Sequence, residues 1–311
     1  MTRYVFGADV GGTTVKIGLL TETGEKVDFW EIPTRTEDHG SNIIPDIAAA
    51  IREKMKEKNI EDTQVIGAGI GVPGAVNADG LCYQAVNIGW ENVNVANELH
   101  SKLKLPVKAG NDANVAALGE AWKGGGQGYP NMCLVTLGTG VGGGIIIEGK
   151  ILTGAKGSGG EIGHIHLVDD EPETCGCGNH GCFEMYASAT GAVRLAKRVL
   201  ASTNEDSVLR NKDFECKDIF AAAKNGDKLA VKASEQYGYY LGKGIAAVAS
   251  VVNPEIVVLG GGVSKAGDVL FDLLKPSFQK YVFPGCRDTK FALAKLGNDA
   301  GVFGAAKLLI D

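Results

Sequence analysis

Two stretches of this sequence repeat one pattern. Residues 4–20 read YVFGADVGGTTVKIGLL, and residues 132–147 read MCLVTLGTGVGGGIII. In each stretch, two apolar runs of strand character flank a glycine-rich corner, which predicts a pair of strands joined by a tight turn. Backbone amides in such a corner can approach phosphate oxygens. The repeat predicts a duplicated architecture with one phosphate-binding corner in each half, while turn chemistry alone would equally give two ordinary hairpins.

The remaining chain alternates strand and helix patterns. Apolar residues recur at helical spacing over residues 45–58, and the apolar run at 64–72 ends at Pro73-Gly74 as a strand would. A helix is expected to begin at Asn111-Asp112, because short polar side chains favour the N-cap position. We further expect a loop at 123–130, helices at 190–201 and 228–251, a strand after Asn253-Pro254 and a last helix at about 300–310. This alternation is typical of an α/β protein.

Composition indicates a folded protein of two domains. At 311 residues the chain is about twice the length of a typical domain of roughly 150 residues. Its 45 glycines are about one residue in seven, roughly double the usual share, and they follow no three-residue period, which excludes collagen. Hydrophobic residues at 44% and charged residues at 22% exclude disorder. The glycines therefore indicate tight turns and close backbone approaches.

The charge balance and the cysteines bear on partners and location. Lys and Arg total 31 against 37 Asp and Glu, and the net charge of −6 offers no electrostatic footprint for nucleic acid or an anionic membrane. The N-terminal residues lack the apolar core of a signal peptide, and no run approaches the ~18 apolar residues of a membrane span. We therefore expect a cytoplasmic protein without nucleic-acid or membrane partners. Its seven cysteines are then expected to be reduced, buried or metal-bound.

The segment CGCGNHGC at residues 175–182 brings three thiols within eight residues. A fourth ligand is available from one of three nearby histidines, His164, His166 or His180. Three thiolates with one imidazole form a common structural zinc shell, and the interleaved glycines let the backbone wrap around an ion. A disulfide would leave one of the three cysteines over. A nucleic-acid zinc ribbon would need a second cysteine pair and a basic face, so the segment predicts structural Zn²⁺.

The glycine corners admit two interpretations as phosphate sites. Residues 138–143, GTGVGG, match the GxGxxG pattern of dinucleotide-binding proteins, with Glu161 about 20 residues further on. A Rossmann loop opens a helix, however, whereas here another strand pattern follows. No Walker A lysine motif occurs in the sequence. The pattern instead favours a hairpin cradle at residues 9–16, whose amides and hydroxyls meet phosphate oxygens while Asp9 holds Mg²⁺ directly or through water.

Four segments together resemble one known family. They are DVGGTTVK at 9–16, LGTGVGGG at 137–144, EIGH at 161–164 and CGCGNHGCFE at 175–184. This set is similar to the ROK family of sugar kinases and sugar-responsive repressors, and the resemblance spans nearly the whole chain. It implies a duplicated actin-like, ribonuclease-H-like ATPase fold of the α/β class, in which sugar and ATP bind in a central cleft between two lobes. The expected smaller lobe is 1–120 with the C-terminal helix at about 298–311, and the larger lobe is 121–297, with the zinc knuckle and the oligomer interface.

The resemblance also implies roles for individual residues. Asp112 matches the catalytic base that takes the proton of a sugar hydroxyl. The residues that match sugar contacts are Gly71, Asn111, Asp112, Glu161, His164 and Glu184. Those that match contacts to ATP are Asp9, Gly11, Gly12, Thr13, Thr14, Lys16, Gly138, Thr139, Gly140, Gly260 and Gly261. The implied zinc ligands are His164, Cys175, Cys177 and Cys182, and the histidine can face the sugar with its second ring nitrogen.

Local chemistry alone would give several of these residues ordinary structural roles. Asn111 and Asp112 would simply cap a helix, Glu161 would be a solvated loop charge, and residues 260–262 would form a tight strand-to-helix turn. A carboxylate at a helix N-terminus is also stabilised as the anion, which makes Asp112 a weak base. Phosphoryl transfer tolerates a weak base, because its loose transition state requires positioning and charge neutralisation more than early deprotonation.

These features predict an ATP-dependent hexose kinase that transfers the γ-phosphate of Mg-ATP to the 6-hydroxyl of glucose. Family kinases for N-acetylglucosamine, N-acetylmannosamine or fructose are the alternatives, because sugar choice depends on pocket shape. A repressor of the family carries a helix-turn-helix domain before the first hairpin, and here the hairpin starts at residue 4. A sugar-binding protein without turnover is expected to lack Asp112 or the first corner, and both are present. The family also implies a homodimer or higher homo-oligomer.

Overall fold

The computed structural model describes residues 2–310, and the chain divides into two compact units. Unit 1 comprises Met1–Pro130, Gly144–Gly160 and Lys295–Asp311, and unit 2 comprises Asn131–Gly143 and Glu161–Ala294. The sequence predicted a boundary after residue 120, whereas unit 1 continues to Pro130 and also includes Gly144–Gly160. Residues 1 and 311, which belong to the predicted smaller lobe, lie outside the described residues.

Unit 1 is built on a five-stranded sheet. Its strands are β1 (Tyr4–Val10), β2 (Thr14–Thr21), β3 (Lys26–Pro33), β4 (Val65–Val72) and β7 (Val107–Asn111), in the order β3-β2-β1-β4-β7. The first three strands pair antiparallel, and β1, β4 and β7 run parallel. A separate hairpin consists of β5 (Leu81–Ala85) and β6 (Trp90–Asn94). The helices are α1 (Glu37–Gly40), α2 (Ile43–Lys58), α3 (Val95–Leu103), α4 (Asp112–Lys123) and α10 (Ala300–Lys307).

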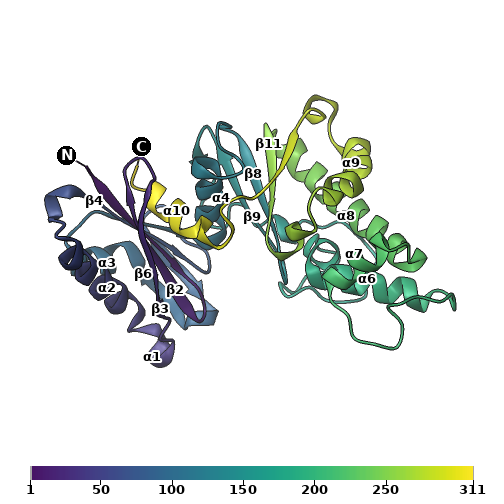
Figure 1. Ribbon diagram of the computed structural model, residues 1–311, viewed down its shortest axis with the longest axis horizontal. Coiled ribbons are helices and arrows are strands. Elements are labelled where there is room, and N and C mark those ends of the chain that lie inside the picture. The colour runs from purple at the N-terminus through teal and green to yellow at the C-terminus, as the bar shows by residue number, and fades with distance from the viewer. Residues whose placement is uncertain (1, 311) are drawn as a thin grey trace. The chain divides into compact units, whose positions relative to one another are not determined.

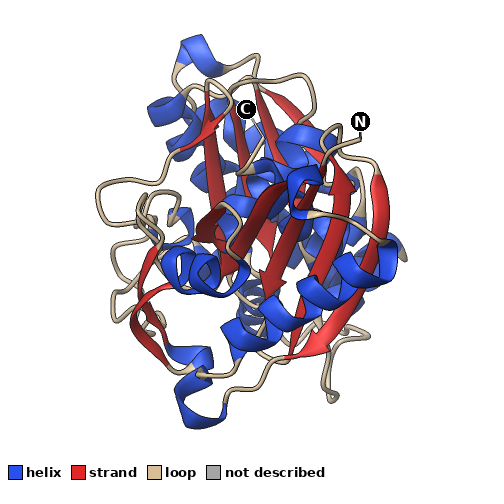
Figure 2. Ribbon diagram, turned by 90° about the vertical axis from the view of Figure 1, so that its left-hand side faces the viewer, coloured by secondary structure: helices blue, strands red, loops and turns tan. Residues whose placement is uncertain are grey.

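Helices cover both faces of this sheet (Figure 2). Successive side chains of β1 point to opposite faces, as they do in any strand. Phe6 belongs to an apolar cluster with the buried residues of α2 and α3, whereas its neighbour Val5 packs in a second cluster with Val302 and Ala306 of α10. The apolar periodicity that predicted a helix at 45–58 thus reflects the face that α2 turns to the sheet.

Two glycines let helix α10 approach the sheet closely. A Cβ atom at Gly7 of β1 would lie 2.0 Å from the carbonyl oxygen of Val302, and one at Gly69 of β4 would lie 1.7 Å from that of Ala305. Any larger residue at either position would therefore push the helix away. The C-terminal helix returns in this way to the N-terminal strands, as Figure 1 shows for the yellow helix α10 beside the purple strands.

A second five-stranded sheet repeats the strand order of the first. Its strands are β8 (Met132–Leu137), β9 (Val141–Ile147), β10 (Lys150–Ile151), β11 (Ile256–Gly260) and β12 (Lys290–Leu293), in the order β10-β9-β8-β11-β12. Strands β8, β11 and β12 run parallel and belong to unit 2. Strand β9 crosses the boundary of the two units at Gly143 and Gly144, and β10 belongs to unit 1. The helices are α5 (Glu184–Ala187), α6 (Ala189–Ala201), α7 (Cys216–Lys224), α8 (Lys228–Val252) and α9 (Val269–Tyr281). The predicted duplication is confirmed.

Side-chain caps fix where the helices of unit 2 begin. The Ser188 hydroxyl accepts the backbone N–H of Gly191 at the start of α6, and Asp227 accepts two backbone N–H groups at the start of α8. The predicted helices at 190–201 and 228–251 are confirmed to within one residue, while the last helix ends at Lys307 instead of about 310. Across residues 2–310, no helix combines the length and apolar character that crossing a membrane requires.

Candidate functional site

The carboxyl ends of three parallel strands meet at one edge of the unit 1 sheet. The register pairs Asp9 of β1 with Gly71 of β4, and Gly71 in turn with Gly110 of β7. Asn111 ends β7, and helix α4 begins at the next residue, Asp112. Ligands of open α/β sheets bind beyond the carboxyl ends of the strands. This edge therefore brings together four predicted site residues, Asp9, Gly71, Asn111 and Asp112.

Hydrogen bonds hold Asn111 and Asp112 at the start of α4. Asn111 is the N-cap residue, and its Oδ1 accepts the backbone N–H of Asn114 at 3.1 Å. Its Nδ2 donates to the carbonyl of Gly74 at 3.0 Å and to Asp112 Oδ1 at 2.9 Å. The same Asp112 oxygen accepts the N–H of Ala113 at 2.8 Å. These donors, together with the helix N-terminus, stabilise a fixed carboxylate, so capping and a catalytic role are compatible in this pair.

Asp9 is a partly buried carboxylate whose charge interacts with that of Asp112. Burial, followed by repulsion from Asp112, raises the pKa of Asp9 to about 6 against the attraction of Lys16. A Cβ atom at Gly301 of α10 would lie 2.3 Å from Asp9 Oδ2, so this glycine lets the α10 backbone pack against the carboxylate. Two carboxylate groups that repel one another are stabilised by a divalent cation with oxygen ligands.

The first glycine corner is exposed between β1 and β2. The N–H of Gly11 donates to the carbonyl of Thr14 at 3.0 Å and closes the turn. The hydroxyl of Thr34 donates to the carbonyl of Gly11 at 2.7 Å, which fixes the corner to the end of β3. Lys16, two residues beyond Thr14, forms an ion pair with Glu31 at 3.6 Å. Residues 11–13 are exposed, so their amides and hydroxyls are open to a ligand.

The second glycine corner is held by the start of helix α6. The N–H of Gly138 donates to the carbonyl of Gly140 at 3.0 Å, and the carbonyl of Gly138 accepts the N–H of Ala189 at 2.8 Å. The Thr190 hydroxyl donates to the carbonyl of Thr139 at 2.8 Å. Both residues of α6 thus fix the backbone of the corner, which is what close approach to a phosphate group requires.

A cavity of about 880 Å³ opens beside this second corner within unit 2. It has the size of an ordinary small-molecule site. Residues that line it come from the corner, from α6 and α7 and from the turn after β11, among them Gly138, Thr139, Val193, Phe220, Gly262 and Val263. The cavity combines apolar side chains with a backbone corner, which suits a ligand that has a flat apolar part and an anionic part.

Gly260 and Gly261 shape the turn that leads to this cavity. Gly260 ends β11 and pairs with Thr136 of β8. Gly261 has a φ of +80°, and a Cβ atom there would lie 2.5 Å from the carbonyl oxygen of Leu137. Only glycine adopts this conformation at this distance without strain. The residues that line the cavity directly belong to the short turn that follows, and they are Gly262, Val263, Lys265 and Ala266.

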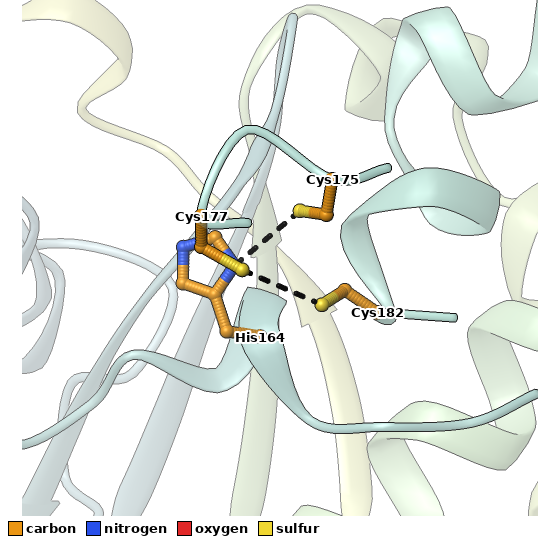
Figure 3. Close-up of side chains that lie close together, drawn as sticks. All are labelled: His164, Cys175, Cys177 and Cys182. Atoms are coloured by element: carbon orange, nitrogen blue, oxygen red, sulfur yellow. Dashed lines mark hydrogen bonds between the residues drawn. The ribbon is translucent and has the colours of Figure 1, made fainter. Parts of the chain in front are cut away.

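Figure 3 shows the ring of His164 and the sulfurs of Cys175, Cys177 and Cys182 turned toward one another. One ligand atom from each residue lies within 4.8 Å of the others. His164 Nδ1 lies 3.7 Å from Cys175 Sγ, and the sulfurs of Cys177 and Cys182 are 3.7 Å apart. All seven cysteines within residues 2–310 are free thiols. The predicted four-residue set is thus brought together.

The chemistry of these donors fits Zn²⁺. Burial raises the pKa of Cys182 to about 12, and the neighbouring sulfurs add to the rise, whereas a hydrogen bond from the Asn179 backbone lowers the pKa of Cys177. Thiols this close oppose one another's ionisation, and a bound cation removes that conflict, because a coordinating thiol is deprotonated outright. Three thiolates and one imidazole form a closed tetrahedral zinc shell.

The other two candidate histidines have different partners. The ring nitrogens of His166 lie 2.9 Å from the carbonyl of His180 and 3.0 Å from Asp169 Oδ1. His180 Nδ1 lies 2.9 Å from the carbonyl oxygen of Glu171. Of the three histidines that the sequence left open, only His164 therefore belongs to the four-residue cluster.

Glu184 links the metal cluster to the second glycine corner. Its Oε2 accepts the N–H of Val141 at 3.0 Å, and a Cβ atom at Gly140 would lie 2.1 Å from the same oxygen. Its Oε1 lies 3.7 Å from Cys175 Sγ. Glu161, by contrast, is exposed at the start of the short turn Ile162–His164. Unit 2 therefore brings Glu184 to the cluster, and Glu161 adjoins it through the backbone.

Sequence reasoning missed two groups of residues in unit 2. Val193 and Phe220 line the cavity from α6 and α7, and only the helical pattern at 190–201 hinted that one of these helices existed. Glu171, which is buried and lies four residues before the first cysteine of the metal cluster, forms an ion pair with the partly exposed Arg198. Their separation of 27 residues leaves no local pattern that could have revealed the pair.

Several known proteins are similar to this chain in both sequence and fold. Residues 5–311 match the ROK family. The chain is 46% identical to the glucokinase of Halalkalibacterium halodurans, over 99% of this chain and 95% of that protein. A ROK family glucokinase from Streptomyces griseus, solved in complex with glucose and AMPPNP, is 36% identical with a TM-score of 0.74 and covers 98% of both chains. The ROK hexokinase from Thermus thermophilus is 30% identical with a TM-score of 0.81, over 97% of this chain and 96% of that one.

Two sheets of one strand order, each with a glycine corner after its first strand, define the class of duplicated actin-like, ribonuclease-H-like ATPases. The predicted α/β fold class is confirmed. Within that class, the chain belongs to the ROK family.

Proposed function

We propose that this protein is an ATP-dependent glucokinase that transfers the γ-phosphate of Mg-ATP to the 6-hydroxyl of glucose. The observation that carries the proposal is the identity of almost half of all residues to a curated glucokinase along nearly the whole chain. The strand-end carboxylates and both glycine corners of a kinase of this class are present and ordered as described above.

Asp112 is the proposed catalytic base. Its carboxylate is held in place by the amide of Asn111 and the N–H of Ala113. In a loose transition state the sugar hydroxyl loses its proton late, and the carboxylate then accepts it. The main contribution of Asp112 is therefore to orient the attacking oxygen, because effective phosphoryl transfer depends on alignment with the γ-phosphate.

ATP binding is assigned to the two glycine corners and the unit 2 cavity. Gly11, Gly12, Thr13, Thr14 and Lys16 are the proposed phosphate contacts of the first corner, and Gly138, Thr139 and Gly140 those of the second. Asp9 is the proposed partner of Mg²⁺, directly or through water. The adenosine part is assigned to the cavity beside Gly262, with Gly260 and Gly261 shaping its wall.

The sugar contacts carried over from the family keep their roles in this proposal. They are Gly71, Asn111, Asp112, Glu161, His164 and Glu184. Carboxylates, an amide and an imidazole offer the donors and acceptors that sugar hydroxyls need at fixed positions. A coupled assay of ADP release with glucose, N-acetylglucosamine, N-acetylmannosamine and fructose tests the choice of sugar. Glucose is expected to give the highest kcat/KM, and a higher value for another hexose would reassign the substrate.

Zn²⁺ is the proposed structural metal, held by His164, Cys175, Cys177 and Cys182. When bound, it supplies a cross-link that fixes the loop at 175–182 to the turn that carries His164. Free thiols suit the reducing cytoplasm, where we place the protein. Elemental analysis of purified protein is expected to give about one zinc per chain. Metal-free protein with full activity would contradict the assignment.

A homo-oligomer is proposed through one face of unit 2. Exposed apolar side chains gather at the ends of α8 and α9, where Val251 is 84% and Phe283 62% exposed. The N–H of Phe283 donates to the hydroxyl of Ser250, so the two apolar residues adjoin. Light scattering of the wild-type protein is expected to show more than one chain per particle. The particle mass of a Phe283→Asp variant is expected to be lower. Val208→Asp, at another exposed apolar position, is the control and is expected to keep the wild-type particle size. A wild-type particle that contains one chain would contradict this proposal.

A further inference from the structure

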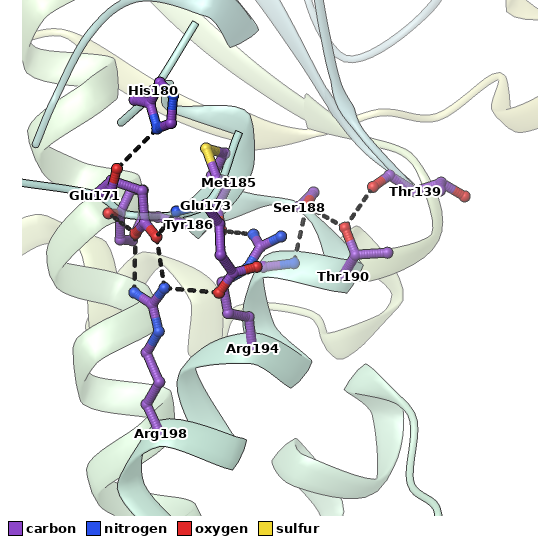
Figure 4. Close-up of polar contacts among 11 residues, drawn as sticks. Thr139, Glu171, Glu173, His180, Met185, Tyr186, Ser188, Thr190, Arg194 and Arg198 are labelled. Carbon is purple, nitrogen blue, oxygen red and sulfur yellow. Dashed lines mark hydrogen bonds and ion pairs between the residues drawn. The ribbon is translucent and has the colours of Figure 1, made fainter. Parts of the chain in front are cut away.

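A buried carboxylate lies in the loop that leads to the cysteines of the metal cluster without belonging to the cluster. The Glu171 side chain is only 1% exposed. Arg198 donates to both of its oxygens, from Nη1 to Oε2 at 2.9 Å and from Nη2 to Oε1 at 2.7 Å. The Tyr186 hydroxyl donates to Oε2, and the N–H of Glu173 donates to Oε1 at 3.1 Å. Figure 4 shows these donors converging on one carboxylate.

The metal loop, residues 169–182, is fixed by further bonds around Glu171. Arg198 Nη2 also donates to Glu173 Oε1 at 2.9 Å, and Arg194 Nε donates to Glu173 Oε2 at 2.9 Å. Between Cys177 and Cys182, the ring of His180 is hydrogen-bonded to the carbonyl of Glu171. Two arginines of helix α6 therefore hold the part of the loop before Cys175, and His180 ties the part between the cysteines back to it.

The same bonds reach helix α5, which follows the last cysteine. Tyr186 lies on α5, two residues after Glu184, and Arg194 donates to the carbonyl of Met185 at 2.6 Å. Thus α6, α5 and the metal loop all meet at Glu171 and the arginines. The network thus reaches the helix that begins with Glu184, whose carboxylate accepts a hydrogen bond from the second glycine corner.

The hydrogen bonds and ion pairs around Glu171 are of a kind that fixes the orientation of the metal loop. A buried carboxylate is costly unless its charge is paired and its oxygens are hydrogen-bonded, and here every donor comes from a different segment. A two-pronged guanidinium fixes orientation as well as distance. Between Cys175 and Cys182 the loop has only turns and isolated bridges. The directions of its sulfurs therefore depend on such anchors, and partners beyond the direct ligands typically change metal affinity by about 10–100-fold.

We propose that Glu171 and Arg198 are positioning residues that clamp the metal loop onto helix α6 and so set the geometry of the four ligands. The inference rests on the proposed zinc site. It extends beyond that site, because neither Glu171 nor Arg198 is one of the four proposed metal ligands. It also assigns α6 two tasks in one helix, since its first turn holds the glycine corner at Thr139 and its later turns hold the metal loop.

The test is the rate at which the zinc-loaded full-length protein gives up its metal to a chelating dye. Glu171→Gln and Arg198→Met are expected to release zinc about tenfold faster or more. Arg35→Met is the matched control, because Arg35 forms an equally two-pronged pair with Asp46 in unit 1, at 2.6 Å for both bonds. The control is expected to release zinc at the wild-type rate. Wild-type protein without zinc would overturn the metal proposal itself, whereas zinc-loaded variants with wild-type release would overturn only the clamp.

A second set of variants covers the case in which Arg198→Met does not fold. Tyr186→Phe removes one hydroxyl, and Arg198→Lys keeps the charge but loses the two-pronged contact. Both are expected to release zinc at intermediate rates and to shift the visible absorption bands of the cobalt-substituted protein. Glu171→Gln is also expected to raise the KM for glucose more than the KM for ATP, because Glu184 follows the loop. Unchanged cobalt spectra and release rates in folded Tyr186→Phe and Arg198→Lys would overturn the proposal.

Discussion

The two sheets share one strand order but differ in the residues that end their parallel strands. In unit 1 these ends carry Asp9, Asn111 and Asp112, all with side chains able to hold charge or hydrogen bonds. In unit 2 the first and second parallel strands run into the glycines that follow Leu137 and Gly260, and a cavity lies beside them. The same topology thus presents a carboxylate-bearing edge in one unit and a backbone-lined cavity in the other.

This difference teaches how a duplicated fold can divide its labour. In the proposed function, the glycines at the strand ends of unit 2 let a nucleotide contact the backbone, and the carboxylates of unit 1 act on the sugar hydroxyl and on Mg²⁺. We therefore expect variants of the strand-end carboxylates in unit 1 to affect turnover, and variants around the unit 2 cavity to affect binding of the adenosine part of the nucleotide.

The largest effect is expected from Asp112→Asn. The amide cannot accept the hydroxyl proton, so kcat is expected to fall by about two to four orders of magnitude, with glucose binding largely kept. Steady-state ADP release and calorimetric titration with glucose check the two parts. Asp213→Asn, at an exposed position of unit 2, is the control. Near-normal turnover of Asp112→Asn would contradict the assignment of the catalytic base to unit 1.

Asp9→Asn is expected to have the next largest effect. Loss of the charge near Mg²⁺ is expected to lower kcat by about one to two orders of magnitude and to raise the Mg²⁺ concentration needed for half-maximal rate. Activity measured across a Mg²⁺ titration at fixed ATP reports both. The exposed Asp79→Asn variant serves for comparison. An unchanged Mg²⁺ requirement would break the proposed link between Asp9 and the metal.

Filling the unit 2 cavity is expected to separate nucleotide binding from turnover. Val193→Trp places a large ring against the cavity wall, and the KM for ATP is expected to rise about tenfold, which corresponds to about 1.4 kcal/mol. The KM for glucose and the kcat at saturating ATP are expected to stay within about twofold of wild type. Val208→Trp, at a position 61% exposed, is the matched control. A rise in the glucose KM alone would contradict the division between the units.

A further prediction concerns stability, and the effect vanishes at low pH. Hydrogen bonds from Arg198, despite the opposing effect of burial, lower the pKa of Glu171 from 4.5 to about 2. A lowered folded-state pKa stabilises the protein above the unfolded value, so this contribution, on the order of 3 kcal/mol, is lost as the pH falls from about 5 toward 2. Urea unfolding of wild type and Glu171→Gln is expected to give a stability gap that narrows over this range. A gap independent of pH would show that the Glu171 charge does not stabilise unit 2.

Local signals made a large part of the fold predictable. The periodic apolar residues of α2, the cap at Asn111 and the two hairpin corners are all encoded within a few residues, and each was predicted from its own segment. The cysteine cluster was equally local, because Cys175 and Cys182 are close in sequence. Local spacing could not choose among the three candidate histidines, since that choice depends on how the chain folds around the loop, and only the family resemblance indicated His164.

Long-range packing accounts for what the sequence could not show. Gly7 and Gly69 are needed because α10, from the far end of the chain, lies against β1 and β4. Their role cannot be predicted from local sequence patterns, because the residues they contact are far away in the sequence. The Glu171–Arg198 pair and the cavity residue Phe220 likewise depend on contacts between separate helices and loops. The excess of glycine thus serves helix packing as well as the corners.

The division between the two units is tested most directly by photolabelling with 8-azido-ATP in the presence of glucose, followed by mapping of the labelled peptides. The account predicts label in the unit 2 segments that line the cavity, around Phe220 and around Val263, and loss of that label in Val193→Trp. Label confined to peptides of unit 1 would contradict it.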